Sequence, residues 1–305
     1  MRSRRLGKHA KHKKLKIGLR IGIIICILFV LSWPFIEPYT LSVDTLALEN
    51  TGIPEGMRPL RIVYLSDIHT ASWPFYTQSR IPSLVKKINS LNPDLVLLGG
   101  DYAQDPESCE AFFRALPSIH ANYGIYAVLG EKDRYPEDST DEKDPTEALS
   151  RLRAAMVAKG VTPLINDVVS IRLADSTVVQ VAGVDDYLNG QSTLEEVALK
   201  CQRENFVIFM SHNPSVLSSI QSAQGGANTR NWYDLGLFGH TLGGQIAPLR
   251  SLLGLTSDVP EAYTHGTLVE GRATNIISNG IGTEKVPLRL FCQPQLHVIT
   301  VRYPR

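Results

Sequence analysis

The sequence predicts a four-layer α/β/β/α sandwich, in which two packed β-sheets are flanked by helices, behind an N-terminal membrane segment. In the first half of the folded part, apolar runs typical of buried strands alternate with amphipathic helices, which indicates βαβ units. A hairpin-like pair then interrupts this alternation and further strands follow, so the strands do not all fit one parallel sheet. The chain has 305 residues, enough for one large domain with a substantial core.

The N-terminus combines a basic head with an apolar run. Residues 1–20 contain nine of the 31 Lys and Arg residues and no acid, and residues 21–36 contain no charge. At about 1.5 Å per residue the run spans roughly 24 Å, short of a ~30 Å hydrocarbon core unless Lys16 and Arg20 snorkel and lengthen it. We expect a retained transmembrane or membrane-dipping anchor rather than a cleaved signal peptide, because no small-x-small cleavage site follows Trp33.

The rest of the chain is mildly acidic. It carries 22 of the basic and all 30 of the acidic side chains, so we expect no nucleic-acid-binding surface and no nucleic-acid partner. The four cysteines are widely spaced and form neither a disulfide framework nor a zinc knuckle. Residues 37–59, with Pro38, Pro54 and Pro59, are expected to be a connector, and the folded domain is expected to occupy residues 60–305.

The periodicity of the apolar residues divides the folded domain into elements. The βαβ part is predicted to contain strands at 61–66, 94–98 and 124–129 and helices at 81–91, 107–116 and 146–159. The hairpin is predicted to consist of strands at 168–173 and 177–184, joined by a turn at 174–176. The last part is predicted to contain helices at 194–200 and 216–222 and strands at 206–210, 234–238, 273–278 and 295–301.

Polar motifs follow four of these strands directly. They are Ser66-Asp67-Ile68-His69, Gly99-Gly100-Asp101, Ser211-His212-Asn213 and Gly239-His240-Thr241. Taken singly, each His is more often structural and an Asp after a strand is often a helix cap. Strands that end at one sheet edge can, however, assemble a metal site from distant parts of a sequence. Carboxylate oxygen and imidazole nitrogen together suit manganese, iron or zinc, so the ordered set favours a metal site.

A fifth segment, Gly130-Glu131-Lys132-Asp133, follows the strand at 124–129 and completes an ordered pattern. In order and spacing, the five segments resemble the D-x-H, G-D, G-N-H-[DE], lone-His and G-H-x-H motifs of the calcineurin-like metallophosphoesterases. The resemblance covers residues 60–301. The stretches GHTLGGQI and NGIGTEKVPLRLFCQP are similar to a bacterial membrane-associated branch, with YkuE- and YaeI-like phosphodiesterases and an alternative UDP-diacylglucosamine pyrophosphatase of lipid A synthesis.

The resemblance implies a two-metal site and assigns its ligands. Asp67 and His69 would bind the first metal, and Asp101 would bridge both metals. The further ligands of the second metal would be Glu131, His212 and His240. The implied cofactor is one or two divalent ions, with manganese favoured over zinc or iron. Two such ions lower the pKa of a bound water and clamp a phosphoryl group during its displacement.

Three residues depart from the family pattern. Glu131 replaces the usual Asn, Lys132 replaces the usual catalytic His, and Leu242 replaces the last His, which binds the first metal. The site is therefore expected to hold the second ion tightly and the first weakly, with His265 as a substitute ligand. Lys132 and Asp101 are the expected catalytic residues, and Lys132 would contact phosphate oxygens as a point charge.

Two functions fit this pattern. The leading one is a membrane-anchored metallophosphoesterase that hydrolyses a phosphodiester or pyrophosphate bond of a lipid-linked substrate, with UDP-diacylglucosamine as the example that the resemblance implies. The alternative is a non-catalytic or single-metal binding protein that retains the fold, which Lys132 and Leu242 favour.

The expected partner is membrane lipid or a lipid-linked phosphate. The positive-inside rule puts the basic head in the cytoplasm and the domain outside, whereas a nucleotide-lipid substrate requires a cytoplasmic domain. A segment that dips into one leaflet would reconcile the two. The sequence predicts no oligomeric state.

Further residues near the motifs have two interpretations each. The apolar loops 73–76 and 249–255 either pack on the core or form a lipid-facing rim beside the metal site. Arg250 and Arg289 either hold phosphate in that rim or form surface ion pairs. His297 is expected on the surface of a strand.

Overall fold

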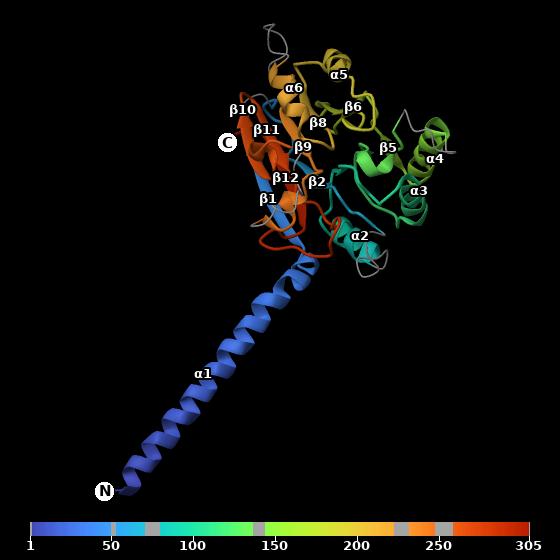
Figure 1. Cartoon of the computed structure of the whole chain (residues 1–305). Coiled ribbons are helices and arrows are strands. Elements are labelled where there is room, and N and C mark those ends of the chain that lie inside the picture. Colours follow the sequence, from blue (N-terminus) through green and yellow to red (C-terminus); the bar gives the residue numbers. More distant parts are fainter. Residues whose placement is uncertain are drawn as a thin grey trace.

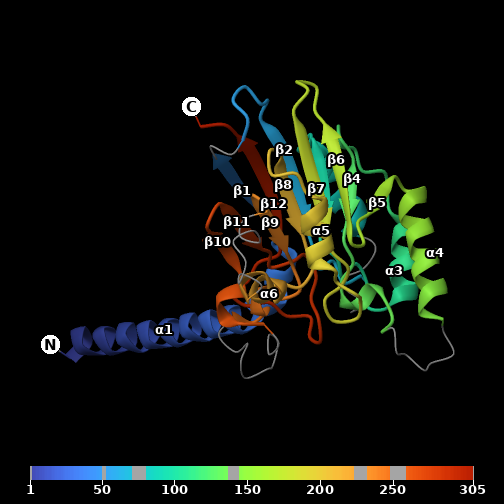
Figure 2. The same ribbon diagram turned by 90° about the horizontal axis from the view of Figure 1, so that it is seen from above.

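The computed structural model describes residues 2–49, 53–70, 80–136, 144–222, 232–247 and 259–304, with the backbone alone for residues 2–15, 221 and 222. Within these residues, two six-stranded sheets form the centre of the domain, and one long helix projects from it (Figure 1). The sheets lie face to face, with helices on their outer sides (Figure 2). The predicted four-layer α/β/β/α fold is therefore confirmed.

The first sheet is built mainly from parallel βαβ units, in the strand order β1-β12-β2-β3-β4-β5. Its strands are β1 (Ser42–Glu49), β2 (Leu60–Leu65), β3 (Leu95–Leu98), β4 (Ile125–Ala127), β5 (Val161–Pro163) and β12 (Gln295–Arg302). Strands β2 to β5 run parallel, β12 is antiparallel to β2, and β1 is parallel to β12. All four residues of β3 are buried, as expected for a parallel strand that is covered on both faces.

Three helices cover the outer face of the first sheet. They are α2 (Ile81–Ser90), α3 (Pro106–Ala115) and α4 (Pro145–Ala158). The Asp105 carboxylate accepts the Ser108 N–H at 2.8 Å and caps α3, and the Asp144 carboxylate accepts the Thr146 N–H at 2.8 Å and caps α4. A proline follows each cap, and its fixed φ suits the first helical turn.

The second sheet contains the predicted hairpin and four further strands, in the order β10-β11-β9-β8-β7-β6. Its strands are β6 (Asp167–Arg172), β7 (Val178–Gly183), β8 (Phe206–Met210), β9 (Leu235–Phe238), β10 (Gly266–Glu270) and β11 (Ala273–Ile277). β6 and β7 form the hairpin, β7, β8, β9 and β11 run parallel, and β10 pairs antiparallel with β11. The outer helices are α5 (Leu194–Lys200) and α6 (Val216–Ser222).

Three layers of buried apolar side chains hold these elements together. The layer between the first sheet and its helices includes Val96 and Phe113. The layer between the two sheets includes Leu97 and Ile208, and the third layer packs the second sheet against α5 and α6. Each fully buried side chain of this kind contributes about 1.5–3 kcal/mol. The layers therefore fix the strand ends of the two sheets relative to one another.

The segment from residue 37 to residue 59 differs from the expected connector. It begins with the short 3₁₀ helix η1 (Glu37–Tyr39), and β1 follows as an edge strand of the first sheet. β1 pairs in parallel register with β12, with Ser42 opposite Gln295. The sequence did not predict this strand, because the half-exposed run SVDTLALE receives its hydrogen bonds from the far end of the chain.

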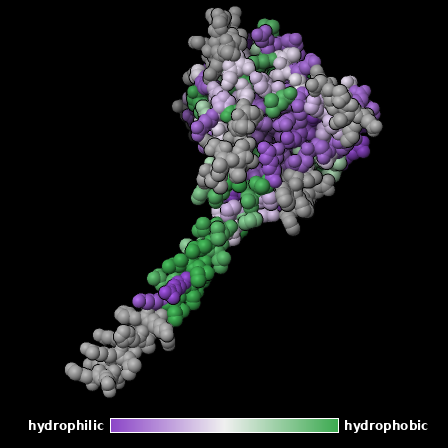
Figure 3. All heavy atoms as spheres, viewed as in Figure 1, coloured by the Kyte–Doolittle hydropathy of each residue, from purple (hydrophilic) through white to green (hydrophobic). Residues whose placement is uncertain are grey.

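Helix α1 (Arg2–Ile36) contains both the basic head and the apolar run. By length and composition, residues 16–39 are able to cross a membrane, and their most apolar stretch is not buried against the domain. Figure 3 shows the apolar surface of α1 continuing to the base of the domain. The chain therefore has one N-terminal apolar helix that could serve as a membrane anchor. Its 24-residue candidate span exceeds the predicted run of residues 21–36 because flanking residues continue the helix.

Candidate metal centre

Four strands bring their polar motifs to one edge of the sandwich. In the first sheet, β2 ends before Asp67 and β3 ends before Asp101, and β8 and β9 of the second sheet lead into the other two motifs. Backbone hydrogen bonds join neighbouring motifs. The Asp67 N–H donates to the Gly100 carbonyl at 2.9 Å, and the His69 N–H donates to the Asp101 carbonyl at 3.0 Å. The motifs are thus held together before any side-chain contact is considered.

The backbone is strained at four of the motif residues. They have positive φ angles: Asp67 at 52°, His69 at 47°, Asp101 at 54° and His240 at 68°. This left-handed region costs a residue other than glycine of the order of 1–3 kcal/mol, and such strain concentrates at functional sites. Position 239 requires glycine because its backbone lies close to the Asp67 side chain, and a Cβ there would lie 2.5 Å from Oδ2 of Asp67. Both features indicate that the backbone is arranged around these side chains.

Five side chains converge in two overlapping groups. One group contains Asp67, His69 and Asp101, and the other contains Asp101, His212 and His240. Within each group the candidate ligand atoms lie within 4.8 Å of one another. Asp101 belongs to both groups, and a shared carboxylate of this kind suits the bridging position of a two-metal site.

Imidazole nitrogens face carboxylate oxygens at distances that leave room between them. Nε2 of His212 lies 3.3 Å from Oδ2 of Asp101 and 3.8 Å from Oδ1 of Asp67. Nε2 of His69 lies 3.8 Å from Oδ2 of Asp101 and 3.9 Å from Oδ1 of Asp67. The ring of His240 stands 5.4 Å from that of His212, at an interplanar angle of 82°. All of these side chains except His240 are buried.

Nδ1 of His212 is held as a hydrogen-bond donor, which leaves Nε2 as the nitrogen that would bind a metal. Nδ1 lies 2.7 Å from the carbonyl oxygen of Gly99 and donates its proton to it. Nε2 is buried and has no hydrogen-bond partner in the described part of the chain. Buried polar atoms are normally paired, so an unpaired nitrogen that faces two carboxylates fits a bound cation. The side-chain amide of Gln104 lies 3.1 Å from Nδ1 of His69 and orients that ring in turn.

Burial and charge act in opposite directions on the titration of the site. Burial raises the pKa of Asp101, but the neighbouring His212 and His69 rings outweigh burial and hold this pKa well below its usual range. Burial lowers the pKa of His212, yet Asp101 and Asp67 raise it well above its usual value. Within the described residues, Asp67 and Asp101 have His69 and His212 as their ion-pair partners. A bound divalent cation would offset the negative charge of these two buried carboxylates.

Asp133 holds the loop that carries Asp101. Its carboxylate accepts the N–H of Asp101 at 2.8 Å, of Tyr102 at 3.0 Å and of Gly130 at 2.9 Å. Burial, followed by the charge of Asp101, raises the pKa of Asp133 to about 7. The motif pattern by itself predicts no role for Asp133, although its place at the end of the fifth motif is an available signal. Asp133 is a positioning residue, since it acts on the site through Asp101.

The fifth motif differs from its expected role. Glu131 belongs to neither metal group, and its carboxylate instead accepts a hydrogen bond from Nζ of Lys132 at 3.1 Å. The same Nζ lies 3.4 Å from Oε1 of Glu284. The described structure thus pairs the Glu131 carboxylate with the Lys132 ammonium, and the expected role of Glu131 as a metal ligand stays a prediction.

Lys132 contributes to the site through its backbone as well as its side chain. Its N–H donates to Oδ1 of Asp101 at 2.9 Å, so it fixes the shared carboxylate directly. Burial lowers the pKa of Lys132, but Glu284 and Glu131 outweigh burial and raise this pKa above its usual value. The side chain therefore stays protonated and positively charged.

The described residues supply no replacement for the missing last His. Leu242 is buried, and its carbonyl accepts hydrogen bonds from Sγ of Cys292 and from the Gln245 N–H, both at 3.0 Å. His265 is exposed and belongs to neither metal group. Each group therefore offers three candidate ligands, where the resemblance implied four for the second metal. The ligand roles themselves stay predictions.

Arg289 is neither a phosphate ligand at a rim nor half of a surface ion pair, so this expectation was wrong. Its side chain is fully buried. The guanidinium donates to the carbonyl oxygens of Gly282 at 2.9 and 2.6 Å, of Asn279 at 2.8 Å and of Cys292 at 2.9 Å. It braces the segment after β11 from within, and a burial of this kind cannot be read from one Arg in a sequence.

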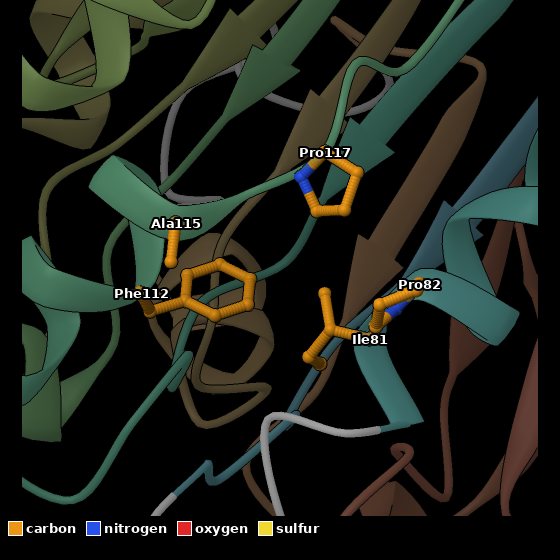
Figure 4. A pocket seen from close by; sticks show the side chains of 5 residues that line it. All are labelled: Ile81, Pro82, Phe112, Ala115 and Pro117. Atoms are coloured by element: carbon orange, nitrogen blue, oxygen red, sulfur yellow. The ribbon is translucent and has the colours of Figure 1, made fainter.

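The other apolar features are two loops and one cavity. The loops 73–76 and 249–255, which include Arg250, fall outside the described residues. A cavity of about 50 Å³ lies between α2 and α3 (Figure 4). It is lined by Ile81, Pro82, Phe112, Ala115 and Pro117. None of these side chains titrates or ligates metal, so the cavity is not a site of hydrolytic chemistry.

Comparison with known proteins matches the chain to a family model. The model describes the calcineurin-like phosphoesterases and matches residues 60–244, which include the expected ligands and catalytic residues from Asp67 to His240 but not the substitute ligand His265. The chain is 24% identical to the uncharacterized metallophosphoesterase YkuE of Bacillus subtilis, over 88% of each protein. It is 30% identical to YpbG of the same species, over 82% of this chain and 84% of YpbG. It is 27% identical to a transmembrane protein with metallophosphoesterase domain of Bos taurus, over 78% of this chain and 53% of the bovine protein.

Proposed function

The chain belongs to the calcineurin-like phosphoesterase family, and on that basis we propose that it is a membrane-anchored, metal-dependent hydrolase of phosphoric ester or pyrophosphate bonds. The observation that carries the proposal is the position of Asp101, whose carboxylate is shared by two groups of three candidate ligands. The unpaired Nε2 of His212 beside it supports the presence of a cation. The nitrogen and oxygen donors suit manganese, which we favour, as well as zinc or iron.

The residues of the chain keep the site in shape for this chemistry. When bound, two divalent cations would lower the pKa of water and neutralise charge on phosphoryl oxygens. Asp101 is held on its backbone side by Asp133 and on its carboxylate side by the N–H of Lys132. The ammonium of Lys132 would attract phosphoryl oxygens, with Glu131 and Glu284 as its counter-ions before substrate binds.

We propose a lipid-linked phosphodiester or pyrophosphate as the substrate. The N-terminal apolar helix supports this choice, as does the bovine relative that is named a transmembrane protein. UDP-diacylglucosamine, the compound that the motif resemblance implies, requires the domain on the cytoplasmic face. The basic head favours the opposite face, where the substrate would be a different lipid-linked phosphoester. Protease protection of the domain in sealed vesicles of known orientation distinguishes these two cases.

The alternative proposal is a protein that binds metal and retains the fold without catalysis. The environment of Lys132 favours it, because two carboxylates hold the ammonium and keep it protonated at the position where the family motif has a His. Leu242 also favours the binding protein, because it replaces the last His of the G-H-x-H motif and so removes one expected metal ligand.

Metal loading and hydrolysis of the full-length chain test the proposal. The detergent-purified chain is stripped with chelator, reloaded with manganese, zinc or iron, and assayed on bis(p-nitrophenyl) phosphate and UDP-diacylglucosamine. Asp101→Asn should lower both metal content and kcat, the latter by more than about 100-fold, since even the outer partners of metal ligands are worth 10–100-fold. Asp175→Asn, which changes an exposed carboxylate in the β6–β7 turn, is the matched control and should have no effect.

The outcomes separate the two proposals. Retention of metal without turnover of any phosphoester would support the binding protein. Full activity and metal content in Asp101→Asn would contradict both proposals, because the shared carboxylate would then have no role.

A further inference from the structure

The N-terminal helix joins the domain at the edge that carries the metal groups. β1 begins at Ser42, opposite Gln295 of β12. β12 is antiparallel to β2, with His297 opposite Tyr64, so the start of β1 lies at the same sheet edge as the end of β2. β2 leads into Asp67 directly. The register of these strands therefore puts the end of α1 at the metal edge, and Figure 1 shows the helix entering the domain from that one end.

The junction between helix and domain consists of buried polar contacts rather than a free linker. Glu37 directly follows α1, and its side chain is 1% exposed. Its carboxylate accepts hydrogen bonds from Nε1 of Trp33 at 2.9 Å, from the N–H of Phe291 at 3.1 Å and from the N–H of Cys292 at 2.5 Å. A buried carboxylate with three donors is costly to disrupt, since each lost partner leaves a polar group unpaired. The end of α1 is therefore fixed to residues 291–292.

The segment that Glu37 holds also supports the metal groups. The N–H of Arg289 donates to the carbonyl of Pro34 at 3.0 Å, and the guanidinium of the same residue donates to the carbonyl of Gly282. The N–H of Gly282 donates to the carbonyl of Asp67 at 2.7 Å. The helix end and the first metal group are thus linked through Arg289 and Gly282.

Large apolar side chains are exposed around this junction. Phe291 is 78% exposed, Phe35 is 59% exposed and Tyr39 is 46% exposed. Phe291 also has a positive φ of 55°, which is unfavourable for an aromatic residue. Aromatic side chains concentrate where a membrane meets water, and a bilayer that contained α1 would reach these three residues. Figure 3 shows apolar surface along α1 up to the base of the domain, where it meets mixed polar and apolar surface.

We propose that Phe291, Phe35 and Tyr39 form a membrane-contact surface at the boundary of the bilayer that α1 enters, and that Glu37 fixes this surface relative to the metal groups. The metal edge of the domain then faces the lipid headgroups. A phosphoester in a headgroup reaches the site without leaving the membrane. The inference rests on the anchoring part of the proposed function and is independent of hydrolysis.

Photocrosslinking in vesicles tests the contact surface. The photoreactive residue p-benzoylphenylalanine is placed at position 291 of the full-length chain, which is reconstituted in phosphatidylethanolamine and phosphatidylglycerol vesicles. Lipid adducts are counted by mass spectrometry after irradiation. The matched controls are position 199 in α5, where Leu199 is 86% exposed, and position 25 within α1. We expect lipid adducts at positions 25 and 291, and at least about tenfold fewer at position 199. Position 25 would lie within the bilayer and position 291 at its boundary, whereas position 199 would lie in water.

The controls make each failure distinct. Adducts at position 25 with no excess at position 291 over position 199 would overturn the contact surface and leave the anchor. An absence of adducts at position 25 would overturn the inference through the anchor itself. Crosslinks from position 291 to a second protein chain would overturn it by identifying a different occupant. Hydrolysis is assayed on the same samples, so failure of the catalytic proposal is seen separately.

A second variant tests the fixed orientation. In Glu37→Gln, one acceptor oxygen and an NH₂ group replace a carboxylate that accepts from three donors, so we expect at least about threefold fewer lipid adducts at position 291 with those at position 25 unchanged. Glu49→Gln, which alters an exposed carboxylate paired with Arg302, is the control. Circular dichroism verifies that the variant is folded. An unchanged adduct yield at position 291 in folded Glu37→Gln would overturn the role of Glu37. The contact surface itself is tested separately, by comparing positions 291 and 199 in the chain that retains Glu37.

Discussion

Arg289 and Pro34 are joined by a hydrogen bond of 3.0 Å, from the backbone N–H of the first to the carbonyl oxygen of the second. The bond connects the last turn of α1 to a residue whose side chain braces the segment beside Asp67. Since Arg289 is fully buried, neither end of this connection can shift without disturbing the other. The position of the helix and the geometry of the metal groups are therefore coupled through one residue.

Truncations within and beyond α1 should have different effects on the domain. Deletion of residues 1–32 retains Trp33, Pro34 and Glu37, and we expect a folded domain with a melting temperature close to that of the full-length chain. Deletion of residues 1–50 also removes β1 and exposes the unpaired edge of β12, so we expect aggregation or a marked loss of stability. Thermal circular dichroism and light scattering measure both outcomes. Equal stability of the two truncated chains would show that β1 is the dispensable connector that the sequence predicted.

Lys132→Ala should reduce turnover if the chain is a hydrolase. The ammonium stays positively charged and would stabilise charge on phosphoryl oxygens, so we expect kcat to fall at least about tenfold, near 1.4 kcal/mol of transition-state stabilisation. Lys200→Ala is the control, since Lys200 is half exposed and its Nζ contacts Asp167 at 3.9 Å and the carbonyl of Asn166 at 3.0 Å, neither of which belongs to a metal group. Steady-state hydrolysis of a phosphodiester with saturating metal is the measurement. An unchanged kcat in Lys132→Ala would remove this residue from the catalytic assignment.

Leu242→His should restore the metal ligand that the family motif has at this position. Residue 242 has a positive φ of 50°, which His tolerates better than Leu. We expect more metal ions to remain per chain after dialysis against chelator, with equal or higher turnover. Leu199→His, at an exposed position of α5, is the control for a His added elsewhere. If elemental analysis finds the same metal content in Leu242→His and the parent chain, residue 242 does not face the site.

His297 should make the stability of the domain depend on pH. It is buried in β12 rather than exposed on a strand surface, so the sequence-based expectation was wrong. Burial lowers the pKa of His297 to about 4, although Asp44 raises it in part. In the unfolded chain a His has a pKa of about 6.5, so between these two values the unfolded state binds a proton that the folded state does not. The contribution of His297 to the free energy of unfolding should therefore fall as the pH decreases through this window, by up to roughly 3 kcal/mol, whereas Asp133, whose folded pKa is about 7, changes the stability in the opposite direction.

The pH dependence is tested by denaturant unfolding of the full-length chain between pH 4 and pH 7. His297→Leu should gain stability relative to the parent chain as the pH decreases through this window, because unfolding no longer binds a proton at this position. His120→Gln, at an exposed position, should differ from the parent chain by an amount that does not change with pH. A difference between His297→Leu and the parent chain that is independent of pH would assign the effect to another group.

Several features of the fold and the site could be predicted from the sequence because they depend on local pattern. Runs of buried residues such as Leu95–Leu98 are apolar throughout, and the hairpin of β6 and β7 is closed by a short turn. Motif order placed Asp67, Asp101 and His212 directly after strands, where the structure has them. A strand that ends in an Asp or His is recognisable from neighbouring residues, and parallel packing then brings such ends to one edge.

The tertiary structure decided everything that depends on partners far away in the chain. It paired β1 with β12, paired Glu131 with Lys132, and enclosed Arg289 among carbonyl oxygens. It also joined the end of α1 to the metal edge through Glu37. Burial of a charged side chain, the choice of its partner and the pairing of an edge strand are set by the energies of contacts between distant residues, and no local pattern in the sequence contains those energies.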